Sequence, residues 1–217
     1  MTILQYLTDP SLAGEAMIIS AGNDGRPYVT LDRTLFHRAG GGQRSDRGSI
    51  GELRVVEVLL HRESGETRHY IEQADFRVGE KAAMIVDKDW RELNSRCHTG
   101  GHLIAAVIEK KYPHVVPDRG HHWPGECRVE CGVEQDLNKD VTDLSADISA
   151  TLAEVVASDV SVQILFSPDD GMRHIKIGRY GAVGCGGTHV ARTGELNGLQ
   201  IKGIKIKNGR MRISYDV

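Results

Sequence analysis

The first 88 residues repeat one pattern, in which short β-branched segments alternate with turn-forming loops. Two pairs of such segments, 14–20 with 26–32 and 53–61 with 67–73, each flank a glycine-containing loop, and a further apolar segment follows them. Paired segments around a loop of this kind are typical of antiparallel hairpins. Because consecutive hairpins curl into a small barrel or a strongly curved sheet, the sequence predicts a barrel-like antiparallel β domain over 1–88.

The pattern changes at Trp90, where apolar residues begin to recur at helical spacing. A helix is predicted over 90–111, ending before Pro113. A second helix is predicted at 141–158, with Asp140 as its N-terminal cap. The apolar face of this second helix comprises Leu144, Ile148, Leu152 and Val155.

The C-terminal part of the chain also contains segments typical of strands. Residues 161–166 form an apolar run that indicates a buried strand, and 174–184 indicate a strand that enters a glycine-rich loop. Asn208-Gly209 is the strongest short signal for a hairpin turn. The predicted class is therefore α+β, with a second, α+β domain over 89–217.

Composition restricts the cellular compartment and the kind of partner that can be expected. Four cysteines in 217 residues are too few for a disulfide framework. No apolar run approaches a membrane span, and the N-terminus has no basic start followed by a long apolar stretch. We therefore expect a cytoplasmic protein with no membrane partner. A net charge of -3 excludes a strongly basic protein, so contact with nucleic acid must come from a local patch.

Two pairs of metal-ligand residues occur at four-residue spacing. His98 and His102 lie one turn apart on one face of the predicted helix, and Cys185 and His189 lie in the loop sequence CGGTH. Three imidazoles and a thiolate suit zinc better than magnesium or calcium. In a chain with ten histidines, spacing alone does not separate this site from ordinary helix histidines and a small buried cysteine.

Three segments resemble, in order, the motifs of the alanyl-tRNA synthetase editing-domain family, which includes the free-standing AlaX-type proteins. RCHTGGHLIAAVI resembles its HTxxHLL-type motif, and VGCGGTHVARTGEL is similar to its CGGTHV motif. LDRTLFHRAGGGQRSDRG resembles its TxF, GGGQ and SDxG motif, and RGHHWPGECRVEC and NGRMRI are weaker likenesses. Together these segments cover most of the chain.

The resemblance implies a hydrolase that acts in trans on mischarged tRNA, removing serine or glycine wrongly esterified to alanine tRNA. It implies one zinc ion per chain in the C-terminal domain, with His98, His102, Cys185 and His189 as ligands. No side chain is assigned as catalytic, because a zinc-associated water serves as nucleophile. Four ligands close a tetrahedral site, so five-coordination, displacement of a ligand and a zinc-bound substrate amine all stay open.

In the family the glycine-rich motif borders the substrate site. The resemblance therefore implies that Gly41 and Gly42 allow close backbone approach and that the Gln43 amide contacts the substrate. Thr34 is expected to discriminate by size and by a hydrogen bond to the serine hydroxyl. A plain tight turn is the alternative for the glycines, whereas the GxxxxGK[ST] phosphate loop is not matched.

Pairing across Asn208-Gly209 places four cationic residues on one face of the terminal hairpin, over an apolar opposite face. This cationic strip comprises Lys205, Lys207, Arg210 and Arg212. It is expected to bind acceptor-stem phosphates of tRNA, with an ordinary solvated surface as the alternative; no DNA partner is expected.

Several other residues and functions stay open. His121, His122, Cys127 and Cys131 form a weaker candidate for a second metal site, and Cys97 is expected to be a buried spectator rather than a nucleophile. Gly100 and Gly101 depart from the family motif, at a cost of about 1 kcal/mol each in helix preference. The alternative functions are an editor of a different tRNA, of the threonyl type, and a non-catalytic tRNA-binding module with a structural zinc.

Overall fold

The computed structural model describes residues 1–72, 77–134, 140–167 and 171–217. Gln73, at the end of a predicted strand, lies outside them. By their contacts the residues form two compact units, 1–40 with 44–92 (unit 1) and 41–43 with 93–217 (unit 2). The structure confirms a mixed class in which strands dominate. None of the described helices combines the length and apolar character that crossing a membrane requires.

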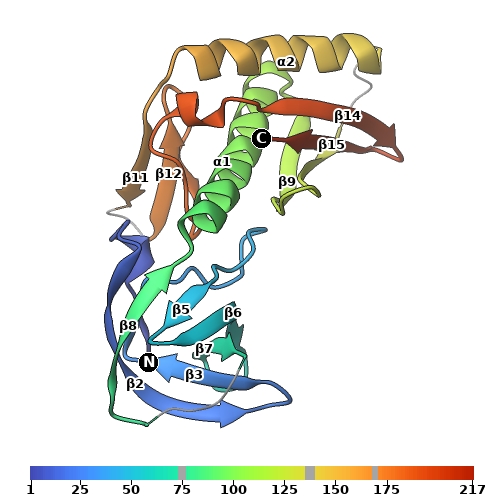
Figure 1. Ribbon diagram of the computed structural model, residues 1–217. Helices are drawn as coiled ribbons and strands as arrows, with labels where there is room; N and C mark the ends of the chain where they lie inside the picture. Colours follow the sequence, from blue (N-terminus) through green and yellow to red (C-terminus); the bar gives the residue numbers. More distant parts are fainter. Residues whose placement is uncertain (73–76, 135–139, 168–170) are drawn as a thin grey trace. The chain divides into compact units, whose positions relative to one another are not determined.

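Unit 1 contains a ring of six antiparallel strands (Figure 1). These are β2 (Ala13–Asn23), β3 (Pro27–Leu31), β5 (Gly48–Ile50), β6 (Leu53–His61), β7 (Glu66–Ile71) and β8 (Lys81–Val86). They pair in the order β2-β3-β7-β6-β5-β8, and β8 pairs again with β2, so the ring closes. The predicted hairpins are β2–β3 and β6–β7. The interior is filled by fully buried side chains of Val29, Leu31, Phe36, Ile50, Val55, Val58 and Met84.

The short strand β4 (Arg33–Thr34) pairs with β1 (Ile3–Leu4). The segment after β4 is held by a buried ion pair between Asp46 and Arg91. Asp46 is fully buried and accepts hydrogen bonds from Arg91 Nε, at 2.9 and 3.0 Å. The Arg91 guanidinium also donates to the carbonyl of Leu35 at 2.7 Å. Asp46 of the SDRG sequence is thus explained by its structural contacts, because a buried guanidinium needs a compensating charge.

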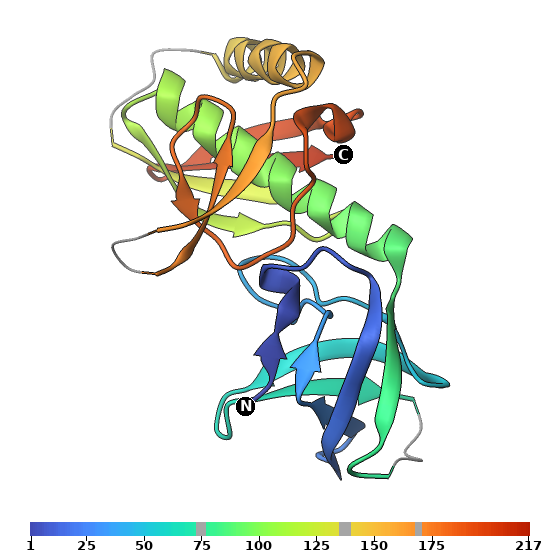
Figure 2. The ribbon, with the colours of Figure 1, turned by 90° about the vertical axis from the view of Figure 1, so that its left-hand side faces the viewer.

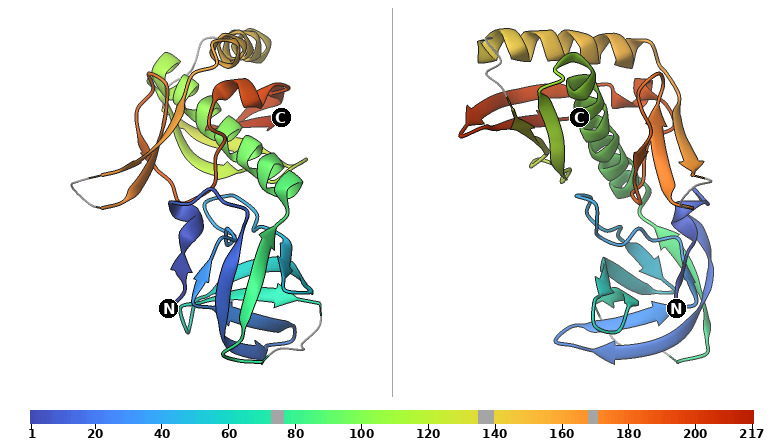
Figure 3. Two further views of the ribbon diagram at one scale, coloured as in Figure 1. Left: turned by 60° about the vertical axis from the view of Figure 1, so that its left-hand side comes forward. Right: turned by 180° about the vertical axis from the view of Figure 1, so that it is seen from behind.

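Unit 2 is built around helix α1 (Lys88–Lys111), which belongs to it from Leu93 onward. One antiparallel sheet has the order β14 (Gln200–Lys207), β15 (Arg210–Asp216), β10 (Arg128–Val133) and β9 (Val115–His121). The other has the order β11 (Val162–Phe166), β12 (Arg173–Ile177) and β13 (Val183–Gly184). Figure 2 and Figure 3 show α1 between these two sheets. Fully buried Leu103, Ile104, Val107 and Ile108 on α1 form the centre of the core.

Helix α2 (Val141–Ala157) confirms the second predicted helix. The Asp140 side chain accepts a hydrogen bond from the Thr142 N–H at 2.7 Å, as expected of a cap. All four residues of the predicted apolar face are buried. The helix packs against β14 and the 3₁₀ turn Thr193–Leu196.

The strand predicted at 161–166 is present as β11, but the prediction that it is buried is wrong. Ile164, Leu165 and Phe166 are 46%, 40% and 54% exposed. β11 is an edge strand of a three-stranded sheet, hydrogen-bonded to β12 alone among the described strands. An apolar run shows that a strand is favourable, but it does not show how many of its faces other elements cover.

Candidate metal centre and adjoining cavity

Four side chains from α1 and from the loop after β13 converge in unit 2. His98 and His102 lie one turn apart on α1, and Cys185 and His189 lie on the loop. One potential ligand atom from each residue lies within 4.8 Å of all the others. His98 Nε2 is 3.2 Å from His102 Nε2 and 3.6 Å from Cys185 Sγ, and Cys185 Sγ is 3.2 Å from His189 Nε2.

These separations fit a tetrahedral metal ion. Bond lengths of about 2.05 Å to nitrogen and about 2.3 Å to sulfur place two nitrogen donors about 3.3 Å apart, and nitrogen and sulfur about 3.6 Å apart. The donor set of three imidazoles and one thiol is also chemically suited to a borderline-soft divalent ion. The cluster can therefore hold a metal ion.

Hydrogen bonds fix the outer nitrogens of two of these rings. His98 Nδ1 lies 2.7 Å from Gln43 Oε1, which can only accept, so Nδ1 carries the proton and Nε2 faces the cluster unprotonated. His189 Nδ1 lies 3.1 Å from Thr99 Oγ1. Metal-binding histidines characteristically have such a partner, because it fixes the tautomer and the ring orientation.

Gln43 also holds the loop that carries the other two donors. Its Nε2 donates to Thr188 Oγ1 at 2.7 Å, and its Oε1 accepts from the Thr188 N–H at 2.8 Å. The side chain is fully enclosed, with 1% of the residue exposed. These contacts give the amide a positioning role, while its predicted contact with the substrate stays a prediction.

The two glycines before Gln43 adopt left-handed backbone angles, with φ of 57° at Gly41 and 79° at Gly42. The Gly42 carbonyl accepts a hydrogen bond from the His122 N–H at 2.8 Å. A Cβ at Gly42 would stand 2.5 Å from the carbonyl oxygen of Gly120. Gly42 therefore lies close to the end of β9, whereas a Cβ at Gly41 would have no described atom within 4 Å. The expected role of the two glycines at the substrate site stays a prediction.

Thr34 lies in unit 1, where its hydroxyl is fully buried and already hydrogen-bonded. It accepts from the Phe36 N–H at 3.1 Å and lies 2.8 Å from His69 Nε2. His69 Nδ1 faces the Val29 carbonyl at 3.3 Å and must donate to it, so the Thr34 hydroxyl donates to Nε2. Burial lowers the pKa of His69 to about 4. The expected role of Thr34 in amino-acid discrimination stays a prediction.

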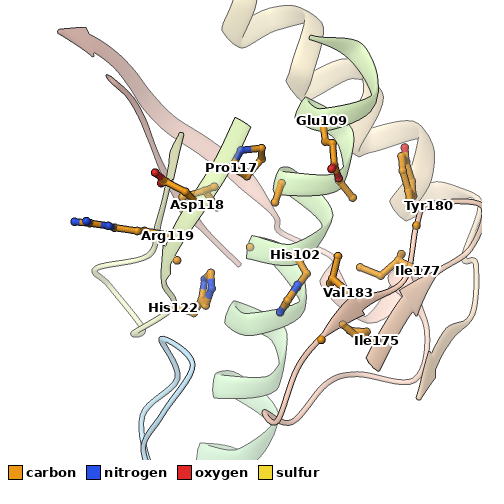
Figure 4. A pocket seen from close by; sticks show the side chains of 17 residues that line it. His102, Glu109, Pro117, Asp118, Arg119, His122, Ile175, Ile177, Tyr180 and Val183 are labelled. Atoms are coloured by element: carbon orange, nitrogen blue, oxygen red, sulfur yellow. The ribbon is translucent and has the colours of Figure 1, made fainter. Parts of the chain in front are cut away.

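A cavity of about 370 Å³ lies beside the cluster (Figure 4). His102 and His122 line one end, and Glu109 lies two turns further along α1, so the cavity extends about 10 Å along the helix. Ile175, Ile177 and Val183 give one wall an apolar surface. Burial lowers the pKa of His102 to about 4 and that of His122 to about 3, which keeps both rings neutral at pH 7.

Several known proteins are similar to this chain in sequence. The alanyl-tRNA editing protein AlaX-L of Pyrococcus horikoshii is 36% identical over 49% of this chain. AlaX-M of Saccharolobus solfataricus is 28% identical over 88% of this chain and 89% of its own length. An alanine–tRNA ligase of Korarchaeum cryptofilum is 30% identical over 99% of this chain. The chain is thus similar in sequence to AlaX-type alanyl-tRNA editing proteins and to an alanine–tRNA ligase.

The chain covers these relatives to different extents. It spans 28% of the length of AlaX-L and 26% of the length of the ligase. No family model matches the sequence.

The second candidate metal site is not assembled within the described residues. Cys127 and Cys131 are buried in the core of unit 2, and the Cys127 thiol donates to the Trp123 carbonyl at 3.2 Å. His122 instead stacks on His98, with ring centroids 4.9 Å apart. Sequence reasoning missed this neighbour of the cluster, although Gly101 carries a signal for it, because a Cβ there would stand 2.2 Å from the His122 ring.

Cys97 is fully buried, as expected for a spectator. The neighbouring Cys127 sulfur and burial hold the pKa of the Cys97 thiol well above its ordinary value. A thiol in this state is a poor nucleophile, because the thiolate is the reactive form.

The cationic strip has the predicted register. Lys205 lies opposite Arg212 and Lys207 opposite Arg210, across Asn208 and Gly209, which both have left-handed backbone angles. Two of the four charges are partly compensated. Arg210 binds Asp118 at 2.8 Å, and Arg212 lies 3.9 Å from Glu130. The two lysines have no ion pair among the described residues.

Proposed function

We propose that this chain is a zinc-dependent hydrolase that removes serine or glycine wrongly esterified to tRNA(Ala), acting in trans. The proposed zinc ligands are His98, His102, Cys185 and His189. The observation that carries the proposal is the convergence of these four donors within 4.8 Å of one another, with two of the rings held by Gln43 and Thr99. The similarity to alanyl-tRNA editing proteins supports this role.

When bound, zinc supplies an activated water and polarises the ester carbonyl. The chain's own residues then have three tasks. Gln43 and Thr99 keep the Nε2 atoms of His98 and His189 directed at the ion. The apolar wall of the cavity, including Ile175 and Ile177, limits the access of other water to the ester. The cavity provides room for the aminoacylated end of the tRNA.

Substrate binding is proposed to use the cationic strip. Lys205 and Lys207 remain available for phosphates of the acceptor stem, whereas Arg210 must be shared with Asp118. Because the rest of the surface carries a net negative charge, this strip is the local patch that the composition requires.

The test combines metal analysis with deacylation assays on the wild type and Cys185→Ala. We expect one zinc ion per wild-type chain and hydrolysis of both seryl- and glycyl-tRNA(Ala). Cys185→Ala should lose zinc, and its rate should fall by about 100-fold or more. As a control, Cys131→Ala changes a buried cysteine outside the cluster and should retain zinc.

Each alternative has its own result. Faster hydrolysis of seryl-tRNA(Thr) than of either alanine tRNA ester would identify an editor of the threonyl type. Tight tRNA binding with an intact ester would identify a binding module with a structural zinc. A metal-free wild type with full activity would reject the zinc-dependent mechanism.

A further inference from the structure

His122 occupies a slot that only glycines leave open. It follows β9 and is 5% exposed. A Cβ at Gly101 would stand 2.2 Å from His122 Cε1, and a Cβ at Gly120 would stand 2.2 Å from His122 Nε2. Gly42 borders the third side, where a Cβ would lie 3.1 Å from Cδ2. The imidazole therefore fills space that ordinary side chains at these positions would exclude, which explains the unusual glycine at position 101.

Tyr215 determines which nitrogen of His122 carries the proton. The Tyr215 hydroxyl donates to the Cys97 carbonyl at 2.6 Å, and the same oxygen lies 2.7 Å from His122 Nδ1. A phenol has a single hydrogen, so Nδ1 must donate to the phenol oxygen. Nε2 is consequently the acceptor nitrogen of the neutral ring.

This acceptor is available to a ligand. No hydrogen bond to His122 Nε2 is present among the described residues. Nε2 is also not one of the buried side-chain atoms that lack both a hydrogen-bond partner and contact with solvent. The residue lines the cavity beside His102, as Figure 4 shows. Its ring centroid is 4.9 Å from that of His98 and 6.2 Å from that of His102. A nearly buried imidazole thus presents an unpaired acceptor next to the four proposed metal ligands.

The chemistry of an aminoacyl ester restricts what this acceptor can bind. The carbonyl and ester oxygens are themselves acceptors and cannot pair with Nε2. Near the reacting carbon, the α-ammonium group is a donor present in every aminoacyl ester, whereas a side-chain hydroxyl is present only in some. The Glu109 carboxylate and the Arg119 side chain both line the same cavity, so the hydrogen-bond acceptor and not the charge of the lining selects the amine.

We propose that His122 Nε2 accepts a hydrogen bond from the α-ammonium group of the aminoacyl ester and positions the ester beside the metal centre. The inference rests on the proposed function for its substrate. It adds a substrate-binding residue outside the zinc ligands and the glycine-rich motif.

Two non-hydrolysable adenosine analogues test this proposal by binding alone. 3′-Glycylamido-3′-deoxyadenosine and its 3′-acetamido counterpart differ only in the amine. The wild type should bind the glycyl analogue about tenfold more tightly, the effect of one hydrogen bond to a charged group. His122→Leu should bind the two analogues with about equal affinity, and its zinc content should be unchanged. His122→Gln should restore part of it, because its side-chain carbonyl can accept.

A second variant moves the ring without altering it. Gly101→Ala displaces His122 from its slot and should also abolish the preference for the amine, whereas Gly100→Ala, whose nearest neighbours are 3.2 Å away, should retain it.

Other results would overturn the proposal. A wild type without preference for the glycyl analogue would do so, as would a preference that survives in His122→Leu. Equal weakening of the binding of both analogues in His122→Leu, or loss of zinc from that variant, would also overturn it. Since no hydrolysis is involved, an amine preference in a protein without deacylase activity would reject only the proposed function.

Discussion

Gly187 lies where the donor loop passes closest to α1. A Cβ at this position would stand 2.1 Å from His98 Cε1 and 2.6 Å from Gln43 Oε1. Its neighbour Gly186 has no such restriction, because a Cβ there would have no atom within 4 Å. The two glycines of the CGGTH sequence therefore differ in function, although the sequence presents them as equivalent.

Gly187→Ala should lower zinc affinity by about 10- to 100-fold, since it separates the loop from His98 and its amide partner. Gly186→Ala is the matched control and should bind zinc as the wild type does. Competition with a chromophoric chelator measures both affinities. Equal affinity in the two variants would show that the loop tolerates a side chain at either position.

Sequence reasoning found the four clustered residues because helical spacing and motif likeness both point to them. It did not find what surrounds them. Gln43 is separated from His98 by 54 intervening residues, and the link between His122 and Tyr215 joins different parts of the chain. Contacts of this kind depend on tertiary packing, which local periodicity does not encode.

At the scale of elements, the barrel of unit 1 encloses a titratable group. His69 on β7 is fully buried between Thr34 and the Val29 carbonyl, and burial lowers its pKa from 6.5 to about 4. In the unfolded chain the imidazole would take up a proton at the higher pH. The unfolded state therefore binds more protons between these two values.

The stability that neutral His69 contributes should be fully present above pH 6.5 and lost as the pH falls toward 4. The shift corresponds to about 3 kcal/mol. Denaturant unfolding with a chelator present should show this loss in the wild type and a flatter profile in His69→Gln. Parallel profiles for the two proteins would contradict the assignment.

The elements themselves were predictable to different degrees. Helix α2 was predictable with its cap and its buried face, because both signals are local. The exposure of β11 was not, since it depends on which elements cover a small sheet. The register of the terminal hairpin was predictable because its two-residue turn fixes the pairing of the strands.

At the scale of the whole molecule, charge is the relevant quantity. A chain with a net charge of -3 can bind a polyanion only where cations are locally concentrated and not neutralised by neighbours. Lys205 and Lys207 meet this condition better than the arginines opposite them, which face Asp118 and Glu130.

Replacing Lys205 and Lys207 together by Glu should weaken tRNA binding and make the plot of log affinity against log salt shallower by about 2, one unit per phosphate contact. The charge-matched control, Lys81→Glu with Arg62→Glu, changes exposed residues of unit 1 and should leave the slope unchanged. Binding measured over a salt series gives both slopes. An unchanged slope in the first variant would assign the strip to ordinary solvated surface.

The tripeptide Gly41–Gln43 packs with unit 2, although the residues on both sides of it belong to unit 1. A fragment that starts at Leu93 would keep all four donors and still lose the amide that orients the His98 ring. The N-terminal sequence therefore cannot be removed without loss to unit 2, because residues 41–43 belong to unit 2. Truncation, domain shuffling or grafting at the start of α1 would therefore separate the four proposed ligands from Gln43, whose side chain orients His98.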